Sequence, residues 1–192
     1  PALAAALRDH RAVLPVYVYA PDEDAPWKPG AASRWWLDRS LRALDAALRR
    51  RGSRLYIVRG PSGAALEALL RKTHAAAVYW NRLYEPAAIA RDTAVKGSLR
   101  ALGADARSFN AALLFEPWEI ESGQGGPYRV FTAFWRKART MLVPRPPIAV
   151  PQHIPSPNID ALPPEALGLA PRIHWDAGLD ASWTPGEDGA AA

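Results

Sequence analysis

Short apolar runs alternate with amphipathic helical segments along the first two-thirds of the chain. The runs 13–20, 55–58 and 76–80 are rich in β-branched and aromatic residues and predict buried strands, and 107–109 predicts a short fourth strand. Pro15 places the start of the first strand close to itself. Strands that alternate with helices pair in parallel through right-handed crossovers. The sequence therefore predicts an α/β fold with a doubly wound, Rossmann-like parallel sheet.

Helical segments are predicted in the intervals between these strands, over 2–8, 31–51, 62–72, 86–102 and 130–142. The sequence opens on the first of these helices, with no strand before it. In a doubly wound fold that begins at its central strand, that first strand would be missing here.

The helix predicted over 31–51 has a candidate N-cap at Ser33 and a stop at Gly52. The residues expected on its core face recur at helical spacing: Trp36, Leu37, Leu41, Leu44 and Leu48. Two Asp–Arg pairs lie four residues apart on this helix: Asp38 with Arg42, and Asp45 with Arg49. We expect both pairs on the outer, solvated face, where each would contribute about 0.3 kcal/mol.

Residues 143–192 have a different character from the rest of the chain. They hold 10 of the 19 prolines and little periodic pattern, which predicts a connector and not a core segment. We therefore expect an α/β domain over 1–142 and a connector over 143–192 that leads to a further domain, so that the chain is a fragment.

Charge is distributed unevenly along the chain. The net charge is +5, but residues 150–192 carry −5, so residues 1–149 carry +10. A body with this charge suits a polyanionic partner, and a solvated Arg-rich surface explains it equally well.

Several classes of site are excluded by composition and motif. The chain has no cysteine, which rules out disulfides, thiolate metal sites and cysteine nucleophiles. It has no long apolar run and no signal-peptide pattern, so we expect a cytoplasmic protein that does not enter the membrane. Glycine-rich nucleotide motifs and a nucleophile elbow are not found, and no histidine has metal-ligand spacing. The sequence therefore predicts no catalytic residue and no metal ligand.

Ligands of doubly wound sheets bind beyond the carboxyl ends of the strands. Three predicted loops lie there: 21–30 with Trp27 and Lys28, 60–63, and 81–85 with Asn81 and Glu85. An aromatic ring, a cation, an amide and a carboxylate would suit a flat polar ligand, and ordinary loop chemistry is the alternative interpretation. The loop 60–63 reads as a turn and helix start, not as a phosphate loop.

A basic stretch without acidic residues coincides with the last predicted helix. Its cations are Arg129, Arg136, Lys137, Arg139 and Arg145, and they interleave with Tyr128, Phe131, Phe134 and Trp135. Such a mixture can hold a nucleic-acid strand. We favour the alternative in which the aromatic rings face the core and the cations face water, where they remain able to contact phosphate.

Motifs in this order resemble the class I DNA photolyase and cryptochrome family. Tyr79-Trp-Asn-Arg-Leu-Tyr-Glu-Pro86 with Ala90-Arg-Asp92 resembles the family's strand–loop–helix signature. Ser33-Arg-Trp-Trp-Leu37 is similar to its second helix, and Gly123-Gln-Gly-Gly-Pro-Tyr-Arg-Val-Phe-Thr-Ala-Phe-Trp135 to the segment before its connector. Trp183-Thr-Pro-Gly-Glu187 resembles the opening of its flavin domain. The similarity covers nearly the whole chain.

The resemblance implies an amino-terminal α/β antenna domain, joined by a connector to a helical domain that binds FAD and the DNA lesion. It implies a light-driven deoxyribodipyrimidine photolyase, in which reduced FAD passes an electron to a cyclobutane pyrimidine dimer flipped out of damaged DNA. This chain alone would then be inactive. A cryptochrome-like blue-light photoreceptor without repair activity and a stand-alone nucleotide-binding module are the alternatives. We expect a monomer.

The resemblance also bears on a light-harvesting chromophore. Relatives that bind folate carry an Asn-Glu pair where this chain has Ala87 and Ala88, which disfavours the usual folate mode. Relatives that bind deazaflavin carry an acid at the position of Leu83, although Glu85 is kept. An FMN-like antenna, deazaflavin or none therefore remains open. The residues expected near such a ligand are Trp27, Lys28, Asn81 and Glu85, with Ser33 and Arg34 closing the other side.

Overall fold

The computed structural model describes residues 1–24, 27–123, 125–143 and 145–191. Ala25 and Pro26 of the first candidate loop, and Gln124 of the glycine-rich segment, lie outside these ranges. The helices and strands follow one another as α1 (Ala2–Asp9), β1 (Val16–Tyr19), α2 (Ala31–Arg49), β2 (Tyr56–Arg59), α3 (Ser62–Thr73), β3 (Ala77–Asn81), α4 (Pro86–Ala101), β4 (Asp105–Phe109), α5 (Phe131–Met141), α6 (Leu179–Ser182) and α7 (Glu187–Ala191). Short 3₁₀ turns are η1 (Pro21–Asp24) and η2 (Pro164–Leu167). The predicted alternation of strand and helix is confirmed.

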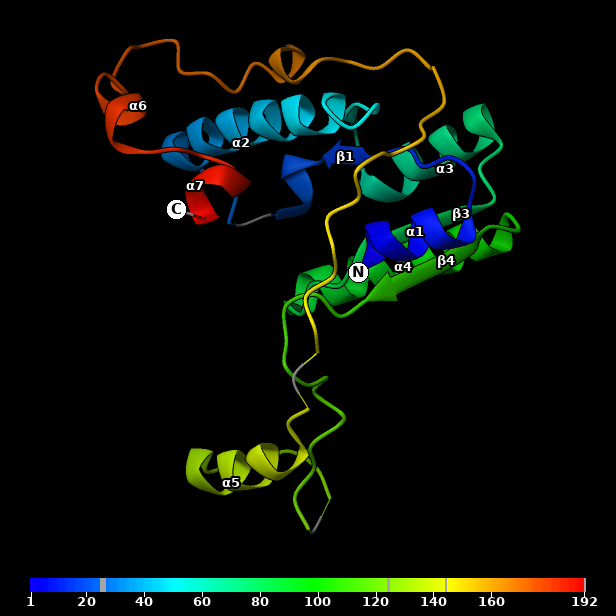
Figure 1. Cartoon of the computed structure of the whole chain (residues 1–192), viewed down its shortest axis with the longest axis vertical. Coiled ribbons are helices and arrows are strands. Elements are labelled where there is room, and N and C mark those ends of the chain that lie inside the picture. The colour runs from blue at the N-terminus through cyan, green and yellow to red at the C-terminus, as the bar shows by residue number, and fades with distance from the viewer. Residues whose placement is uncertain (25–26, 124, 144, 192) are drawn as a thin grey trace.

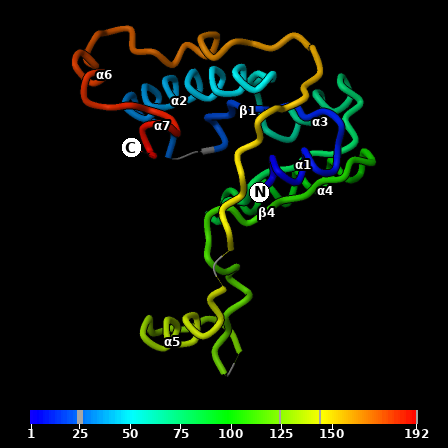
Figure 2. The backbone as a smooth tube through the Cα atoms, viewed as in Figure 1, coloured from blue at the N-terminus to red at the C-terminus, as the bar shows by residue number. Residues whose placement is uncertain are grey.

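The strands are parallel, as predicted, and they form two separate pairs. β1 pairs with β2, starting from Val16 opposite Tyr56, and β3 pairs with β4, starting from Ala77 opposite Asp105. α3 contacts β1, β2 and α4, so it links the two halves, while α1 packs on β3 and α4 on β4 (Figures 1 and 2). The parallel pairing agrees with the predicted α/β fold.

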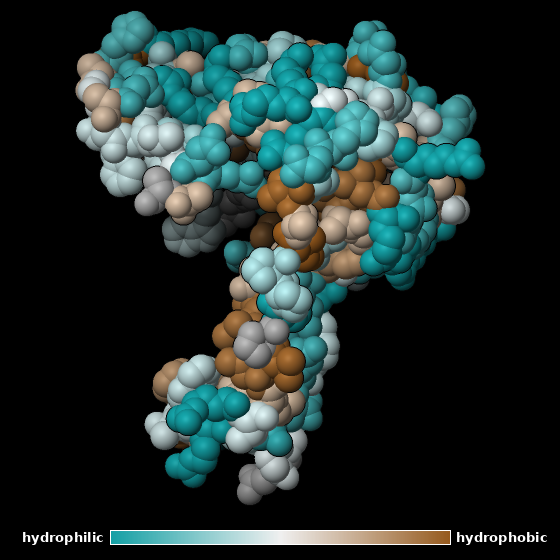
Figure 3. Space-filling view, viewed as in Figure 1, coloured by the Kyte–Doolittle hydropathy of each residue, from teal (hydrophilic) through white to brown (hydrophobic). Residues whose placement is uncertain are grey.

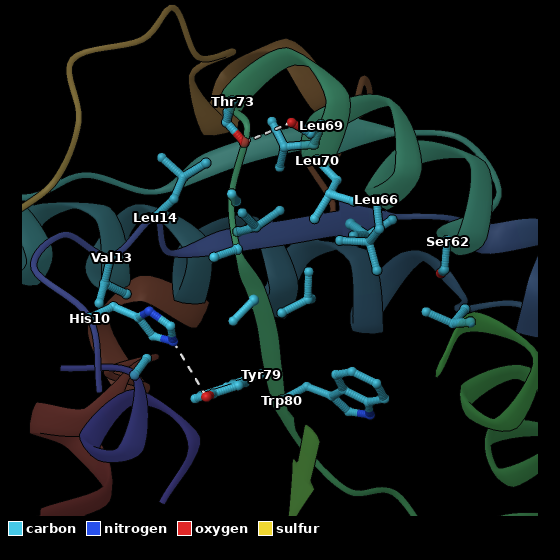
Figure 4. Close-up of a pocket in the computed structure, with 18 of the residues that line it drawn as sticks. His10, Val13, Leu14, Ser62, Leu66, Leu69, Leu70, Thr73, Tyr79 and Trp80 are labelled. Atoms are coloured by element: carbon cyan, nitrogen blue, oxygen red, sulfur yellow. Dashed lines mark hydrogen bonds between the residues drawn. The ribbon is translucent and has the colours of Figure 1, made fainter. Parts of the chain in front are cut away.

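An apolar slot separates the two strand pairs. It has a volume of about 590 Å³ and is lined from both sides, by Val16 and Val18 of β1 and by Val78 and Trp80 of β3. Figure 4 shows Leu66, Leu69 and Leu70 of α3 above it and Tyr79 and Trp80 below. A further parallel strand in this slot would join the two pairs into one sheet.

Two apolar clusters form the core. The first lies between α2, β2 and the connector and is made of Leu41, Leu48, Leu55, Ile57, Ile154, Leu167 and Leu169. The second lies between α3, α4 and β4 and is made of Leu70, Val95, Leu99, Ala104 and Ala106.

The connector contributes to the first of these clusters. Ile154, Leu167 and Leu169 are buried, the amide of Ile154 donates to the carbonyl of Arg51 (2.8 Å), and the amide of Val13 donates to the carbonyl of Pro155 (2.7 Å). The expectation that this segment is not part of the core is wrong. Proline prevents regular helix and sheet, but an extended chain still buries the apolar side chains between its prolines. The division at residue 142 stays a prediction.

The buried face of α2 differs from the predicted one. Trp35 is buried, while Trp36 and Leu44 are exposed. The helix begins after Gly30, and Ser33 is an exposed residue of its first turn, so the predicted Ser33 cap is wrong. The connector lies along α2 (Figure 1), contacts it through η2, and bonds to the indole of Trp35 through Asp176, so a second layer covers this side of the helix.

Residues 112–123 and 125–143, which we call the arm, extend away from both clusters and carry α5 (Figure 1). Phe131 is 71% exposed and Trp135 is 38% exposed, so the predicted core-facing orientation of these rings is wrong. The arm has no sheet to cover. α5 packs within the arm instead, through the buried Ala138 and through Phe134, whose ring lies 6.3 Å from that of Tyr128.

Candidate functional site

The loop after β1 carries the first group of predicted ligand residues. Trp27 is 87% exposed, and Lys28 reaches the carboxylate of Asp22 (Nζ to Oδ1, 2.5 Å). Arg34, on the first turn of α2, donates from Nη1 to the carbonyl of Pro29 (2.9 Å). The loop is therefore folded back on itself by one ion pair and one hydrogen bond. Its indole face is free for a planar ligand.

The loop before α3 is closed by the protein's own carboxylate. Glu23 accepts from the amide of Ser62 at 2.6 Å and from its hydroxyl at 2.5 Å. Glu23 therefore supplies the negative charge that the amino terminus of a helix favours. The interpretation of residues 60–63 as a turn and helix start is confirmed.

The segment after β3 carries the second group of predicted residues. The Oδ1 atom of Asn81 accepts from the amide of Ala2 (3.1 Å), at the first turn of α1. Glu85 is the exposed N-cap residue of α4 and makes no side-chain capping bond. Asn81 thus holds the start of α1 against the carboxyl end of β3, and Glu85 is free to meet a ligand.

A cluster that the sequence interpretation missed lies on the opposite side of this segment. Arg82 and Tyr84 both bond to the carboxylate of Glu116, Tyr84 from its hydroxyl at 2.9 Å. The guanidinium of Arg82 also lies 5.4 Å from the centre of the Trp118 ring. Burial, followed by the hydrogen bond to Glu116, raises the pKa of Tyr84 above its ordinary value.

Alternation along 81–85 was the signal for this cluster. Asn81, Leu83 and Glu85 are exposed, while Arg82 and Tyr84 are half-buried, as in an extended chain with period two. Reading the run as a strand extension would have placed Arg82 and Tyr84 inward from the sequence alone.

Behind these residues, Lys96 of α4 is enclosed by polar and aromatic groups. Its Nζ donates to the hydroxyl of Ser108 (2.9 Å) and lies 5.4 Å from the Trp80 ring centre. The indole of Trp80 donates to Asp92 (2.9 Å). Burial, followed by repulsion from nearby arginines, lowers the pKa of Lys96.

The two predicted groups of ligand residues lie at the carboxyl ends of different strand pairs. The first belongs to β1 and α2, the second to β3 and α4, and the slot runs between those pairs. Within the described ranges, the side-chain bonds of Lys28 and Arg34 stay inside the first loop, and Asn81 accepts from the start of α1. The arrangement offers stacking, hydrogen bonds and charge to a ligand, which suits binding of a planar polar molecule.

Comparison with known proteins decides the family. The family model for DNA photolyase matches residues 1–155. The chain belongs to the DNA photolyase family. It is 37% identical over 193 residues to a deoxyribodipyrimidine photo-lyase of Agrobacterium fabrum, covering 98% of this chain and 40% of that protein. It is 38% identical over 190 residues to cryptochrome-1 of Arabidopsis thaliana, covering 97% of this chain and 28% of that protein.

A solved structure of a bacterial class III photolyase from Agrobacterium tumefaciens superimposes with a TM-score of 0.88 at 36% identity. The match covers 99% of this chain and 39% of that one. This photolyase-family chain therefore spans less than half the length of these relatives. Among its described helices, none is both long and apolar enough to cross a membrane.

Proposed function

We propose that this domain belongs to a light-driven deoxyribodipyrimidine photolyase, which repairs cyclobutane pyrimidine dimers in DNA. The observation that carries the proposal is the match of almost the entire chain to photo-lyases, in sequence and in fold. The expectation of class I stays a prediction, since the solved relative with 36% identity is named class III. The monomeric state and the cytoplasmic location also stay predictions.

A cryptochrome-like photoreceptor is the second candidate function. It is favoured by the 38% identity to Arabidopsis cryptochrome-1, which equals the identity to the photo-lyase within one per cent. Both functions would use the same α/β domain, so residues 1–191 do not separate them. They differ in whether DNA is the substrate.

FAD would supply the photochemical electron in either case. We propose that it is bound by the part of the relatives' length that this chain does not span. Consistent with this division, the described groups at the carboxyl ends of the strands are suited to holding a planar molecule, and none of them forms a nucleophile–base pair.

A light-harvesting chromophore is the ligand that we propose for the carboxyl ends of β1 and β3. The exposed indole of Trp27 would stack on a planar ring system, and Lys28, Ser33 and Arg34 would offer donors to it. Asn81 and Glu85 would bound the other side. Ala87 and Ala88 offer no polar group to a folate, which disfavours that pigment. An FMN-like pigment or deazaflavin is therefore the class of ligand that we propose.

The repair proposal is tested with the complete protein and an oligonucleotide that contains a thymine dimer. Under blue or near-ultraviolet light, we expect dimer splitting, measured by recovery of absorbance at the pyrimidine band. A protein that binds flavin and responds to light, yet leaves the dimer intact, would support the cryptochrome function and overturn the repair proposal.

The chromophore site is tested by Trp27→Ala in the same complete protein. We expect loss of the second chromophore, measured by chromatography of the released pigments, while FAD is retained. Trp175→Ala is the matched control, because it removes another exposed indole that lies on the connector. Equal pigment content in the Trp27 variant and the parent would contradict this site.

A further inference from the structure

The carboxylate of Glu116 joins the arm to the body. One of its oxygens accepts from Nη1 of Arg82, and the other accepts from the hydroxyl of Tyr84 (2.9 Å). The side chain of Glu116 is 11% exposed, and hydrogen bonds to a charged acceptor contribute more when water is largely excluded. The ring of Trp118 lies 5.4 Å from the guanidinium of Arg82 on the same side. Figure 3 shows the arm projecting clear of the body, so contacts near its start fix its position.

A turn fixes the backbone on the arm's side of this contact. The carboxylate of Glu119 accepts from the amide of Glu116 (2.7 Å), and the amide of Glu119 donates to the carbonyl of Glu116 (3.0 Å). Ile120, which follows the turn, is buried. This reciprocal pair of bonds has the form of a capping box. The carboxylate of Glu116 therefore moves only together with the turn 116–119.

On the body's side, the contact holds a segment that lies beyond the end of its partner strand. β4 ends at Phe109, opposite Asn81, and the amide of Arg82 donates to the carbonyl of Phe109 (2.8 Å). Regular structure resumes at Pro86, where α4 begins. Between these points, the side-chain bonds of Arg82 and Tyr84 to Glu116 hold the chain where the ladder no longer does.

The same segment carries two of the proposed pigment residues on its other face. Arg82 and Tyr84 are half-buried. Asn81 and Glu85 are exposed, because side chains alternate along an extended chain. We propose that Glu116 is a positioning residue of the proposed pigment site and couples pigment binding to docking of the arm. The inference rests on the proposed function for the identity of the ligand.

Coupling of this kind is reciprocal. If docking of the arm strengthens pigment binding by a given factor, bound pigment makes undocking of the arm rarer by the same factor. We expect a factor of about five, at the lower end of typical couplings between two sites. A Glu116 that only stabilised the fold of the arm would show no such reciprocity.

The test uses the complete protein, saturated with FAD and freed of its second pigment, with FMN as the probe. Equilibrium dialysis measures the affinity for FMN, and hydrogen exchange of the peptides 81–89 and 116–122 reports opening of the segment and of the arm's turn. In the parent, bound FMN should slow exchange of 116–122 about fivefold. Glu116→Ala should weaken FMN binding by the same factor, speed exchange of both peptides and abolish the effect of FMN on 116–122.

Two further variants separate positioning from a general loss of charge in the arm. Glu116→Gln keeps an acceptor oxygen and the shape of the side chain, so its affinity for FMN should lie between those of Glu116→Ala and the parent. Glu121→Ala removes an exposed carboxylate from the same arm and is the matched control. This control should match the parent in FMN affinity and in the exchange of both peptides.

Two results would overturn the proposal. The first is faster exchange of 116–122 in Glu116→Ala with no change in 81–89 or in FMN affinity, which would make Glu116 a structural residue of the arm alone. The second is equal behaviour of Glu116→Ala and Glu121→Ala. A parent that does not bind FMN would contradict the proposed FMN-like ligand instead. The coupling of arm and segment would then be upheld by a joint change of both peptides in Glu116→Ala and refuted by a change in one alone.

Discussion

α2 and α5 are both rich in arginine, but the arginines of α2 form ion pairs and the described arginines of α5 do not. On α2, Arg39 pairs with Asp38, Asp176 and Asp180, and Arg42 pairs with Asp38 and Glu165. On α5, the described cations have no partner. The connector accounts for the difference, because it brings acidic side chains to α2 and none to α5. Cations that a fold neutralises itself serve its stability, whereas cations left unpaired remain available to a partner.

The ion pairs of α2 also differ from those that the sequence predicts. Asp38 pairs with Arg42 and Asp45 with Arg49, as expected from the four-residue spacing. Both carboxylates are buried, however, and Asp38 is only 1% exposed, so their placement on the outer face is wrong. The hydrogen bonds to Asp38 raise the pKa of Arg42, and those to Asp180 and Asp38 raise that of Arg39. The connector adds Glu165, Asp176 and Asp180 to the pairs around Asp38, and the guanidinium groups of these pairs stay partly exposed.

Asp38→Ala should have the largest effect on stability. It leaves Arg39 and Arg42 without their buried partner, and we expect a loss of about 2–3 kcal/mol, below the range for fully buried pairs because both guanidinium groups are partly exposed. Urea denaturation measures the change. Glu121→Ala, an exposed carboxylate in the arm, is the control and should stay within about 0.5 kcal/mol of the parent.

The same measurement on Arg136→Ala sharpens the comparison. An unpaired surface cation contributes little to folding, so this variant should also stay within about 0.5 kcal/mol of the parent. Equal destabilisation by Asp38→Ala and Arg136→Ala would show that the two helices do not differ in the way described.

Asp45 combines an ion pair with a backbone contact, and substitution separates the two. Its Oδ1 accepts from the amide of Leu55 (2.8 Å), at the start of β2, and its Oδ2 accepts from Arg49. Asp45→Ala leaves the buried amide unsatisfied and should cost about 1–3 kcal/mol. Asp45→Asn keeps an acceptor and should recover most of that loss in urea denaturation. If Asp45→Asn lowers the free energy of unfolding as much as Asp45→Ala does, the ion pair with Arg49 and not the bond to the Leu55 amide supplies the stabilisation.

The connector's attachment to α2 should depend on Asp176. Its Oδ2 accepts from the indole of the buried Trp35 at 2.9 Å and lies 3.5 Å from Arg39. Asp176→Ala should reduce the local stability of α6 by about 1 kcal/mol, which is roughly a fivefold faster amide exchange. Hydrogen exchange at Trp183, whose amide donates to the carbonyl of Leu179, reports the change. Exchange in α5 should be the same in both proteins.

The smallest expected effect is the titration of Tyr84. Because its pKa is raised in the folded state, its contribution to folding is complete below the ordinary tyrosine pKa of about 10 and is lost as pH rises through the raised value. An ultraviolet titration should show one phenol that ionises at a higher pH than the others, and Tyr84→Phe should remove that step. Glu116→Gln should shift it downward while leaving the other tyrosines unchanged.

Much of the fold was predictable because it depends on local patterns. Period-two and period-3.6 repeats gave the order of the four strands and of the helices α1 to α5, and the alternation gave their parallel pairing. The N-cap of α2 was not predictable from Ser33, because the turn at Pro29 and Gly30 starts the helix earlier. The aromatic residues of α5 lie on a helix, as their spacing predicts. The spacing does not show whether a sheet is present for these residues to pack against.

The candidate site was predictable in part for the same reason. Strand ends indicated which loops lie at the carboxyl ends of the sheet, and Trp27 is exposed there as expected of a stacking residue. The contact between Glu23 and Ser62 and the Arg82–Tyr84–Glu116 cluster join residues more than 30 positions apart. No local pattern contains such pairings.

By itself, the sequence determined the class of fold, the parallel pairing and the family, because each is recorded in the spacing or identity of neighbouring residues. Tertiary structure decided which charges are neutralised. Asp38 and Arg136 are both charged residues on amphipathic helices, and only the path of the connector buries one and leaves the other in water. Burial depends on what the chain places against a surface from a distance, and a helix's own sequence does not contain that information.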